Sequence, residues 1–272
     1  MMRALWSGAS GMIAQQKHLD SIANNLANVN TVGFKNERTE FKSLLYQTIQ
    51  TRSTSANGAT KPIGAQVGLG TRTASITTEF RQGAFEDTGN ELDFAISGDG
   101  FFQVEDGSGD IYYTRDGSFN LVPDENGRLT LVTSDGWYVL DSNGNHITYP
   151  QNVTSPQVYV DANGNFAYAT EDGTIEYLNQ QLALYQFANP AGLEKIGSNC
   201  YNITEVSGDP MQEGVVNGLI TSTVRQGYLE MSSVSVADEM VDMIVTQRAY
   251  EMNSKAITTA DTMMEQANQL KR

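Results

Sequence analysis

Two segments of the chain, one near each end, repeat apolar residues at a spacing of seven. Near the N-terminus this row consists of Leu5, Met12, Leu19 and Leu26. Near the C-terminus it consists of Val236, Met243, Tyr250, Ile257 and Met264, with a second row of Ala249, Ala256, Met263 and Leu270 beside it. A spacing of seven is typical of helices that present one apolar seam to a partner. Both ends are therefore predicted to be long amphipathic helices.

The C-terminal helix is expected to be unusually long, because no Gly or Pro follows Gly227. Ser235 is placed to cap its N-terminus, and Asp238 and Glu239 put acidic groups in the first turn, where they suit the helix dipole. Lys271 and Arg272 put positive charge at the other end. A helix of about 35 residues would span roughly 50 Å.

The middle of the chain alternates strand-like runs with turn dipeptides. The runs are short and rich in β-branched and aromatic residues, such as LDFAISGDGFFQVED and GRLTLVTSDGWYVLD. They are separated by Asp116-Gly117, Asn126-Gly127, Asp135-Gly136, Asn143-Gly144 and Asn163-Gly164. Such dipeptides supply the positive φ of two-residue hairpin turns. An antiparallel β domain is predicted over residues 92–210.

We therefore expect an α+β protein in three parts. Residues 1–35 plus 233–272 are expected to pack as a discontinuous, coiled-coil-like core domain of the two helices. Residues 36–91 plus 211–232 form an extended linker region with short strands, and the β domain is inserted between them. Within the linker, the Thr/Ser/Gly/Ala-rich stretch from Ile49 to Gly70 indicates an extended arm.

The apolar faces of the two predicted helices are wider than one two-helix contact can bury. Nothing in the β segment matches either seam. The seams are therefore expected to meet copies of themselves, which predicts a self-assembling subunit.

Four asparagines, Asn24, Asn25, Asn28 and Asn30, crowd the end of the first predicted helix. Asparagine is a poor helix former because its amide competes for nearby backbone groups. One interpretation is that these residues face solvent and that Asn30 ends the helix in left-handed geometry. The other is that they form a polar margin that fixes the register of an interface. The second is favoured for Asn24 and Asn28, which flank the seam, and both stay open for Asn25 and Asn30.

Composition excludes several other classes of protein. A formal net charge of −15 argues against a nucleic-acid partner, because phosphate binding needs a basic face. The single cysteine, Cys200, excludes an internal disulfide framework. No stretch has the length and apolarity of a membrane span, and the N-terminus does not resemble a cleaved Sec signal peptide. The chain is expected to stay in the cytoplasm or to leave without losing a leader.

The motifs that carry enzyme chemistry are missing. GASGM lacks the spacing of a nucleophile elbow, and GLGTRT lacks the third glycine of a dinucleotide loop. In DSNGN and DANGN the glycine stands fourth rather than sixth, so hairpin turns explain them better than calcium loops. His18 and His146 lie in segments of different type. We predict that the chain is not an enzyme and that it uses no cofactor or metal.

The run LDSIANNLANVNTVGFK, residues 19–35, resembles the N-terminal signature of the bacterial flagellar rod and hook family. Residues 226–257 are similar to the second signature of that family, and ISGDGFFQV and YTRDGSF resemble its core strands. LWSGASGMIAQQ and LLYQTI are most similar to the branch of the family that forms the distal rod. A proximal rod or hook-type subunit remains an alternative, as does a secreted β-rich binding module outside the family.

The resemblance implies a structural subunit of the basal-body rod, whose terminal helices line a helical tube that transmits motor torque to hook and filament. It implies type III export without a cleaved signal peptide, a place in the basal body within the cell envelope and periplasmic space, and tails that become ordered only on assembly. The implied partners are copies of the chain, proximal rod proteins, the hook protein and the export apparatus, with rod-surrounding ring proteins as a further candidate. Residues 51–70 are the hypothesised source of contacts that stiffen the rod.

The expected interface residues come from two sources. The seams contribute Leu5, Met12, Leu19, Leu26, Val236, Met243 and Ile257. The signatures imply Asn24, Asn25, Asn28, Thr31, Gly33 and Phe34, together with Gln247, Arg248, Tyr250, Glu251, Asn253 and Lys255. Tyr250 is expected to pack in the seam, and Phe34 to anchor the chain against a neighbour. Arg248 and Lys255 have helical spacing to Glu251, and such pairs contribute roughly 0.3 kcal/mol each if exposed.

Overall fold

The computed structural model describes residues 2–50, 65–124, 127–150, 157–170, 174–216 and 218–270. The chain divides by its internal contacts into two units. Unit 1 consists of residues 1–27, 37–77 and 235–272, and unit 2 of residues 28–36 and 78–234. Two long helices and a large antiparallel sheet confirm the α+β class. These boundaries differ from the three parts expected from the sequence. Residues 28–36, 78–91 and 211–232 belong to the same unit as the β domain.

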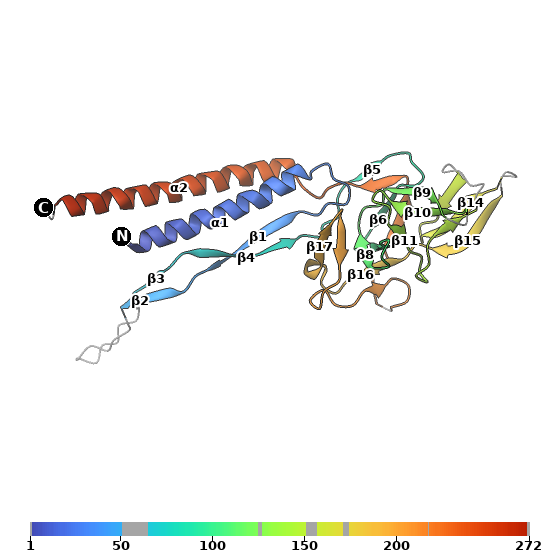
Figure 1. Ribbon diagram of the computed structural model, residues 1–272, viewed down its shortest axis with the longest axis horizontal. Helices are drawn as coiled ribbons and strands as arrows, with labels where there is room; N and C mark the ends of the chain where they lie inside the picture. The colour runs from blue at the N-terminus through green and yellow to red at the C-terminus, as the bar shows by residue number, and fades with distance from the viewer. Residues whose placement is uncertain are drawn as a thin grey trace. The chain divides into compact units, whose positions relative to one another are not determined.

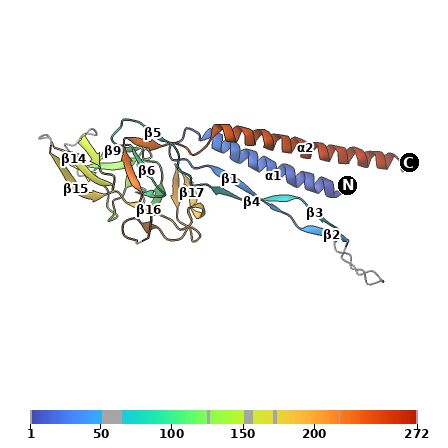
Figure 2. The ribbon, with the colours of Figure 1, turned by 180° about the vertical axis from the view of Figure 1, so that it is seen from behind.

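Unit 1 contains a pair of helices and a β ribbon. Helix α1 (Met2–Ala27) and helix α2 (Val236–Gln269) lie side by side in both views (Figures 1 and 2). In the ribbon, β1 (Glu37–Ser43) pairs with β4 (Thr71–Thr78), and β2 (Tyr46–Gln50) pairs antiparallel with β3 (Ala65–Gly68). The arm predicted from Ile49 to Gly70 therefore has paired strands at its base. Its residues 51–64 lie outside the described residues.

Small residues of α1 lie close against α2. A Cβ atom on Gly8 would lie 2.9 Å from Cγ1 of Ile257, and one on Gly11 would lie 2.9 Å from Nδ2 of Asn253. Gly8, Gly11 and the nearby Ala14 are buried, whereas Leu5 and Met12 of the predicted seam are only half-buried. The buried face of α1 is thus next to the predicted seam rather than on it, because small side chains let the helix backbones approach closely.

Helix α2 has 34 residues, close to the expected length, and begins after Ser235 as predicted. The Ser235 side chain makes no capping hydrogen bond, and Lys271 and Arg272 lie outside the described residues. The buried residues of the helix are Glu239, Thr246 and Ala260. In the predicted second apolar row, Ala256, Met263 and Leu270 are exposed in the single chain, and Ala249 is half-buried. The buried positions of α2 thus carry polar or small side chains. Coiled-coil-like packing is not confirmed. No helix of the described part is long and apolar enough to span a membrane.

Unit 2 is built around a ten-stranded sheet. Its main path runs β12 (Thr148–Tyr149), β10 (Leu129–Thr133), β11 (Tyr138–Val139), β7 (Phe101–Glu105), β8 (Ile111–Thr114), β18 (Cys200–Asn202) and β17 (Glu194–Gly197). Off this path, β9 (Phe119–Pro123) pairs with β10, β16 (Leu184–Gln186) with β7, and β19 (Met211–Gln212) with β16. Neighbouring strands of this sheet pair antiparallel.

Smaller sheets complete unit 2. One consists of β13 (Val158–Val160), β14 (Asn165–Ala169) and β15 (Ile175–Gln181), in that order. In two further pairs, β20 (Thr223–Gln226) joins β6 (Phe94–Ser97), and β21 (Tyr228–Glu230) joins β5 (Phe85–Asp87). A 3₁₀ turn, η2 (Pro190–Gly192), precedes β17.

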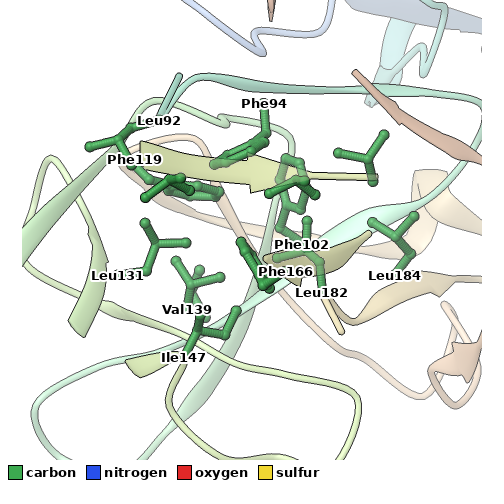
Figure 3. Close-up of a cluster of buried hydrophobic side chains, with 14 of the residues drawn as sticks. Leu92, Phe94, Phe102, Phe119, Leu131, Val139, Ile147, Phe166, Leu182 and Leu184 are labelled. Carbon is green, nitrogen blue, oxygen red and sulfur yellow. The ribbon is translucent and has the colours of Figure 1, made fainter. Parts of the chain in front are cut away.

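The core of unit 2 collects apolar side chains from several of these sheets (Figure 3). Its labelled members are Leu92, Phe94, Phe102, Phe119, Leu131, Val139, Ile147, Phe166, Leu182 and Leu184. Full burial of a Leu, Ile, Val or Phe side chain stabilises the fold by about 1.5–3 kcal/mol. This cluster is therefore the main source of stability of the β unit.

Most of the predicted glycine turns are present. Gly127, Gly136, Gly144 and Gly164 all have a positive φ, between 72° and 86°, although Asn126 lies outside the described residues. The turn predicted at Asp116-Gly117 is wrong, because β8 and β9 pair with other strands and not with each other. A Cβ atom on Gly117 would lie 1.7 Å from the carbonyl oxygen of Phe94. Position 117 needs glycine because its backbone touches the backbone at Phe94.

Candidate assembly surface

The helix pair of unit 1 exposes large apolar side chains. On α1 these are Trp6 and Ile13, and on α2 they include Met240, Val241, Ile244, Val245 and Met252. Monomeric soluble proteins rarely leave such residues together at the surface, and where they do the patch is usually an interaction site. The outer faces of both helices are therefore candidates for contact with protein.

A pocket of about 350 Å³ lies between the two helices of unit 1. Its lining residues are Gln15, Gln16 and Leu19 from α1, and Thr246, Gln247, Tyr250 and Glu251 from α2. Four of these, Leu19, Gln247, Tyr250 and Glu251, are residues that the sequence marked for an interface. Tyr250 is 44% exposed, so the packing expected of it is incomplete in one chain. The pocket is wide enough to take an apolar side chain from outside.

The other predicted residues of the two helices are only partly covered. Leu5, Met12, Leu26, Met243, Asn253 and Ile257 are half-buried, whereas Val236, Arg248 and Lys255 are exposed. Nη1 of Arg248 lies 2.8 Å from Oε2 of Glu251, and both side chains are more than half exposed. An exposed pair of this kind contributes a few tenths of a kcal/mol at most.

Asn25 does not face solvent, so that interpretation of it is wrong. It is 1% exposed, and its side-chain amide makes two hydrogen bonds, one to the carbonyl oxygen and one from the backbone N–H of Glu37. Its neighbour Asn24 is exposed and donates to the carboxylate of Glu37 at 3.0 Å. Both asparagines therefore tie α1 to the first residue of β1, within unit 1.

The turn after α1 is closed by its own residues. Thr31 donates its N–H to the carbonyl oxygen of Asn28 and its hydroxyl to the side-chain oxygen of Asn28, each at 3.1 Å. Asn30 does not take the predicted left-handed geometry. Gly33 does, with a φ of +69°, and a Cβ atom there would lie 2.9 Å from backbone atoms of Arg115 and Asp116. Glycine is thus required at the position where the chain changes direction.

Phe34 is buried inside unit 2, where Nζ of Lys195 lies 5.2 Å from the centre of its ring. The expectation that it anchors the chain against a neighbour is therefore not met, because the chain itself covers the ring. Its role is to hold residues 28–36 in unit 2.

A buried cluster of charges, missed in the sequence, joins distant segments of unit 2. Nζ of Lys35 lies 2.5 Å from Oε1 of Glu230, and Nη1 of Arg115 lies 3.3 Å from Oε2 of the same carboxylate. All three side chains are at most 3% exposed. Lys35 also donates to the carbonyl oxygen of Arg81, and the N–H of Gly83 donates to Glu230.

Burial of the two cations of this cluster, Lys35 and Arg115, costs free energy. Burial lowers the pKa of Lys35, and the positive charge of Arg115 lowers it further, while Glu230 acts in the opposite direction. Burial likewise lowers the pKa of Arg115. Glu230 therefore compensates two desolvated charges at once. No spacing rule could reveal this, since 195 residues separate Lys35 from Glu230.

The side chains best suited to catalysis or metal binding have structural roles instead. Within the described residues, no three His, Cys, Asp or Glu side chains gather as a metal site. The Cys200 thiol is buried, and burial raises its pKa to about 12, so it is a poor nucleophile. In the DSNGN turn, Oδ1 of Asp141 accepts the N–H groups of Asn143 and Asn145, as expected of a hairpin.

Exposed apolar helices, a pocket between them and a β unit stabilised by its own core are the features of a structural assembly subunit. Three segments match families of such proteins: residues 5–35 match "Flagella basal body rod protein", residues 95–177 "Flagellar hook protein FlgE/F/G D1 domain", and residues 225–270 "Flagellar basal body rod FlgEFG protein C-terminal". The chain belongs to the flagellar basal-body rod and hook protein family. It is a structural subunit of the flagellar rod and not an enzyme, as predicted.

Full-length relatives share much of the sequence. The flagellar basal-body rod protein FlgG of Borreliella burgdorferi is 45% identical, over 100% of both chains. FlgG of Agrobacterium fabrum is 46% identical, over 96% of this chain and 97% of the other. Among solved structures, the flagellar hook protein FlgE2 of Helicobacter pylori covers 62% of this chain and 47% of its own, at 18% identity and a TM-score of 0.24.

Proposed function

We propose that the chain forms the distal part of the rod by polymerising through its helix pair into a helical tube that transmits torque. The observation that carries the proposal is the pocket lined by Leu19 and Tyr250, in a unit that also exposes apolar side chains on both helices. The occupant is an apolar side chain from a helix of a second copy. The distal position is supported by the names of the FlgG relatives.

The proposed interface includes the predicted residues that one chain leaves partly open. These are Leu5, Met12, Leu19, Leu26, Val236, Met243, Gln247, Arg248, Tyr250, Glu251, Asn253, Lys255 and Ile257. Asn24 and Asn28 stand at its margin. Asn25, Thr31, Gly33 and Phe34 act indirectly, because they shape the subunit that polymerises.

The helices are expected to become fully ordered only in the polymer. Their buried contact uses Gly8, Gly11, Thr246 and Ala260, so one helix pair removes little apolar surface from water. Amide hydrogen exchange should therefore be fast in both helices of the monomer and slow in the polymer. Equal protection in the two states would contradict this part of the proposal.

The test of polymerisation compares two similar substitutions. Val245 on α2 is 60% exposed, and Val122 at the end of β9 is 46% exposed. Val245→Asp should raise the concentration needed for polymerisation of the purified chain at least tenfold, because the new charge would be buried between copies. Val122→Asp should leave it unchanged. If both variants sediment as polymers at the wild-type concentration, the helix pair is not the interface.

The ribbon is a second candidate surface for rod contacts. Leu45, Tyr46 and Ile49 are exposed on it, and residues 51–64, between β2 and β3 in the sequence, lie outside the described residues. We propose that this arm contacts a neighbouring subunit and stiffens the rod. Deletion of residues 51–64 should yield polymers that bend more, and unchanged bending stiffness in electron micrographs would contradict the idea.

Membership of the family supports a proposal for the remaining partners and the location. We propose contacts with proximal rod proteins at one end and with the hook protein at the other, and passage through the type III export apparatus without cleavage of a leader. Rod-surrounding ring proteins in the periplasmic space are the proposed outer neighbours. Mass spectrometry of the exported chain tests the leader directly: a mature N-terminus other than that of the translated chain would refute it.

A further inference from the structure

One face of the three-stranded sheet of unit 2 carries two exposed tyrosines. Tyr159 on β13 and Tyr177 on β15 are both cross-strand partners of Ala167 on β14. Partners across a sheet point to the same side, so the two tyrosines flank Ala167, which is itself 0% exposed. Tyr159 is 50% exposed and Tyr177 66%. We call Tyr159, Ala167 and Tyr177 the tyrosine face.

The opposite side of this sheet packs against the core. Phe166, next to Ala167, points into the hydrophobic cluster (Figure 3), and Tyr168 packs against the same cluster. Val158 and Val160, which flank Tyr159, are buried in it as well. The strands that carry the tyrosine face are therefore anchored by the hydrophobic core behind them. Two strand spacings, roughly 10 Å, separate the backbone positions of Tyr159 and Tyr177.

A polar pocket of about 450 Å³ begins at Tyr177. Apart from Tyr177 and Phe166, its lining consists of one hydroxyl residue and five amides, namely Ser142, Asn143, Asn165, Asn179, Gln180 and Gln181. We call it the amide pocket. Among the residues that the structure describes, no charged side chain lines it, although the chain as a whole has a formal net charge of −15. A second pocket of about 310 Å³ shares Ser142, Asn165 and Gln181 with it.

Amides without charges favour an uncharged, hydrogen-bonding ligand. Each primary amide offers both donors and an acceptor, which matches vicinal hydroxyl groups or an acetamido group. Some of these amides are already oriented: Gln181 donates to the carbonyl oxygen of Asn163 at 2.9 Å, and Gln180 accepts the N–H of Thr148 at 3.3 Å. A phosphate-bearing or acidic polymer would find no cation among these lining side chains.

We propose that the tyrosine face and the amide pocket bind an uncharged glycan. Pyranose rings have an apolar face that stacks on a tyrosine ring, and hydroxyl groups at the edge that bond to amides. The spacing of Tyr159 and Tyr177 suits two sugar units of one chain. The ligand class is an oligomer of hexose or N-acetylhexosamine units. The site lies entirely in unit 2 and does not depend on polymerisation through the helices.

The test is calorimetric titration of the full-length monomer with two probes, a β-1,4-linked N-acetylglucosamine tetramer and the glucose tetramer of the same linkage. Saturable binding of either probe is expected. Tyr177→Ala and Tyr159→Ala should each weaken it about tenfold, because each removes one stacking ring. Both residues are exposed, so the variants should fold. Ile196→Ala is the control, since Ile196 is 49% exposed but lies on β17, outside the tyrosine face and the amide pocket.

Three outcomes would overturn the proposal. One is the lack of binding of both tetramers by the wild-type chain at millimolar concentration. Another is binding that both tyrosine variants leave unchanged. The third is that Tyr177→Ala weakens polymerisation while neither tetramer binds, because the face would then be a contact between copies of the chain.

Discussion

Asn25 and Glu37 are joined by two hydrogen bonds that use both ends of one side-chain amide. Nδ2 of Asn25 donates to the carbonyl oxygen of Glu37 at 2.9 Å, and Oδ1 accepts the N–H of Glu37 at 2.9 Å. The amide thus pairs with the strand end as another strand would. Asparagine costs helix propensity, less than about 0.7 kcal/mol, and this paired contact outweighs that cost.

Replacement of Asn25 by Ala should loosen the contact between α1 and β1. The variant leaves a donor and an acceptor of the half-buried Glu37 without these partners, and each such group costs roughly 1–3 kcal/mol when it is shielded from water. We expect a loss of about 2–4 kcal/mol in local stability, measured in the assembled rod as faster amide exchange over residues 19–27. Asn24→Ala is the neighbouring control and should cost under about 1 kcal/mol, since its contact is exposed. Similar losses in the two variants would contradict this role.

The sequence predicted those features that depend on local periodicity or turn chemistry. The two helices and the Asn-Gly and Asp-Gly hairpins follow from residue spacing and from the need for a positive φ. The role of Asn25 could not be predicted, because its partner is a backbone group twelve residues away. The position of the helix contact was also missed. Heptads reveal large apolar residues, whereas the α1–α2 contact of unit 1 is made at Gly8 and Gly11.

The charge cluster shows a second limit of local patterns. Lys35 closes the N-terminal signature, Glu230 ends β21 and Arg115 follows β8. Each looks like an ordinary surface charge in the sequence, because no periodic apolar pattern surrounds it. Only the tertiary pairing of distant segments makes the three neighbours, and only then does burial become possible.

Glu230→Gln should destabilise unit 2 strongly. Removal of the carboxylate leaves Lys35 and Arg115 as buried cations without their shared counter-charge, which typically costs about 3–5 kcal/mol. Urea unfolding at neutral pH measures this loss. Glu251→Gln breaks an exposed ion pair on α2 and should change stability by under about 0.5 kcal/mol. If Glu230→Gln behaves like this control, the cluster does not stabilise the fold.

The same variant should gain stability as the solution becomes alkaline. Burial already holds the pKa of Lys35 below its usual 10.5, and loss of Glu230 lowers it further. Between the folded pKa and 10.5 the unfolded chain binds more protons, so the contribution of Lys35 to stability rises with pH. Urea unfolding midpoints are measured over this pH range for Glu230→Gln and for a Lys35→Met, Glu230→Gln double variant. The difference between the two midpoints reports the contribution of Lys35. A falling difference over that window would show that Lys35 is not desolvated.

Three glycine-to-alanine changes in unit 2 should have effects of different sign. Gly117→Ala places a methyl group against the Phe94 carbonyl and should cost about 1–3 kcal/mol or more through overpacking. Gly136 has a φ of +86° but open space around it, so Gly136→Ala should cost about 1 kcal/mol through backbone strain alone. Gly107 has neither restriction, and Gly107→Ala should stabilise by about 0.4–1 kcal/mol. Thermal unfolding ranks the three, and a Gly117 variant as stable as the Gly107 variant would contradict the close approach.

Cys200 should make the fold sensitive to alkaline pH. Burial raises the pKa of its thiol from 9.0 to about 12 in the folded chain. The unfolded chain therefore releases the proton first, so the contribution is fully present below pH 9 and is lost as the pH rises toward 12. Between pH 8 and pH 10 the loss from this group amounts to about 1 kcal/mol. Cys200→Ala removes this titration, so the wild-type chain should lose about that much more stability than the variant over the interval. Parallel urea midpoints for both chains from pH 8 to pH 10 would show instead that the thiol is not buried in the folded unit.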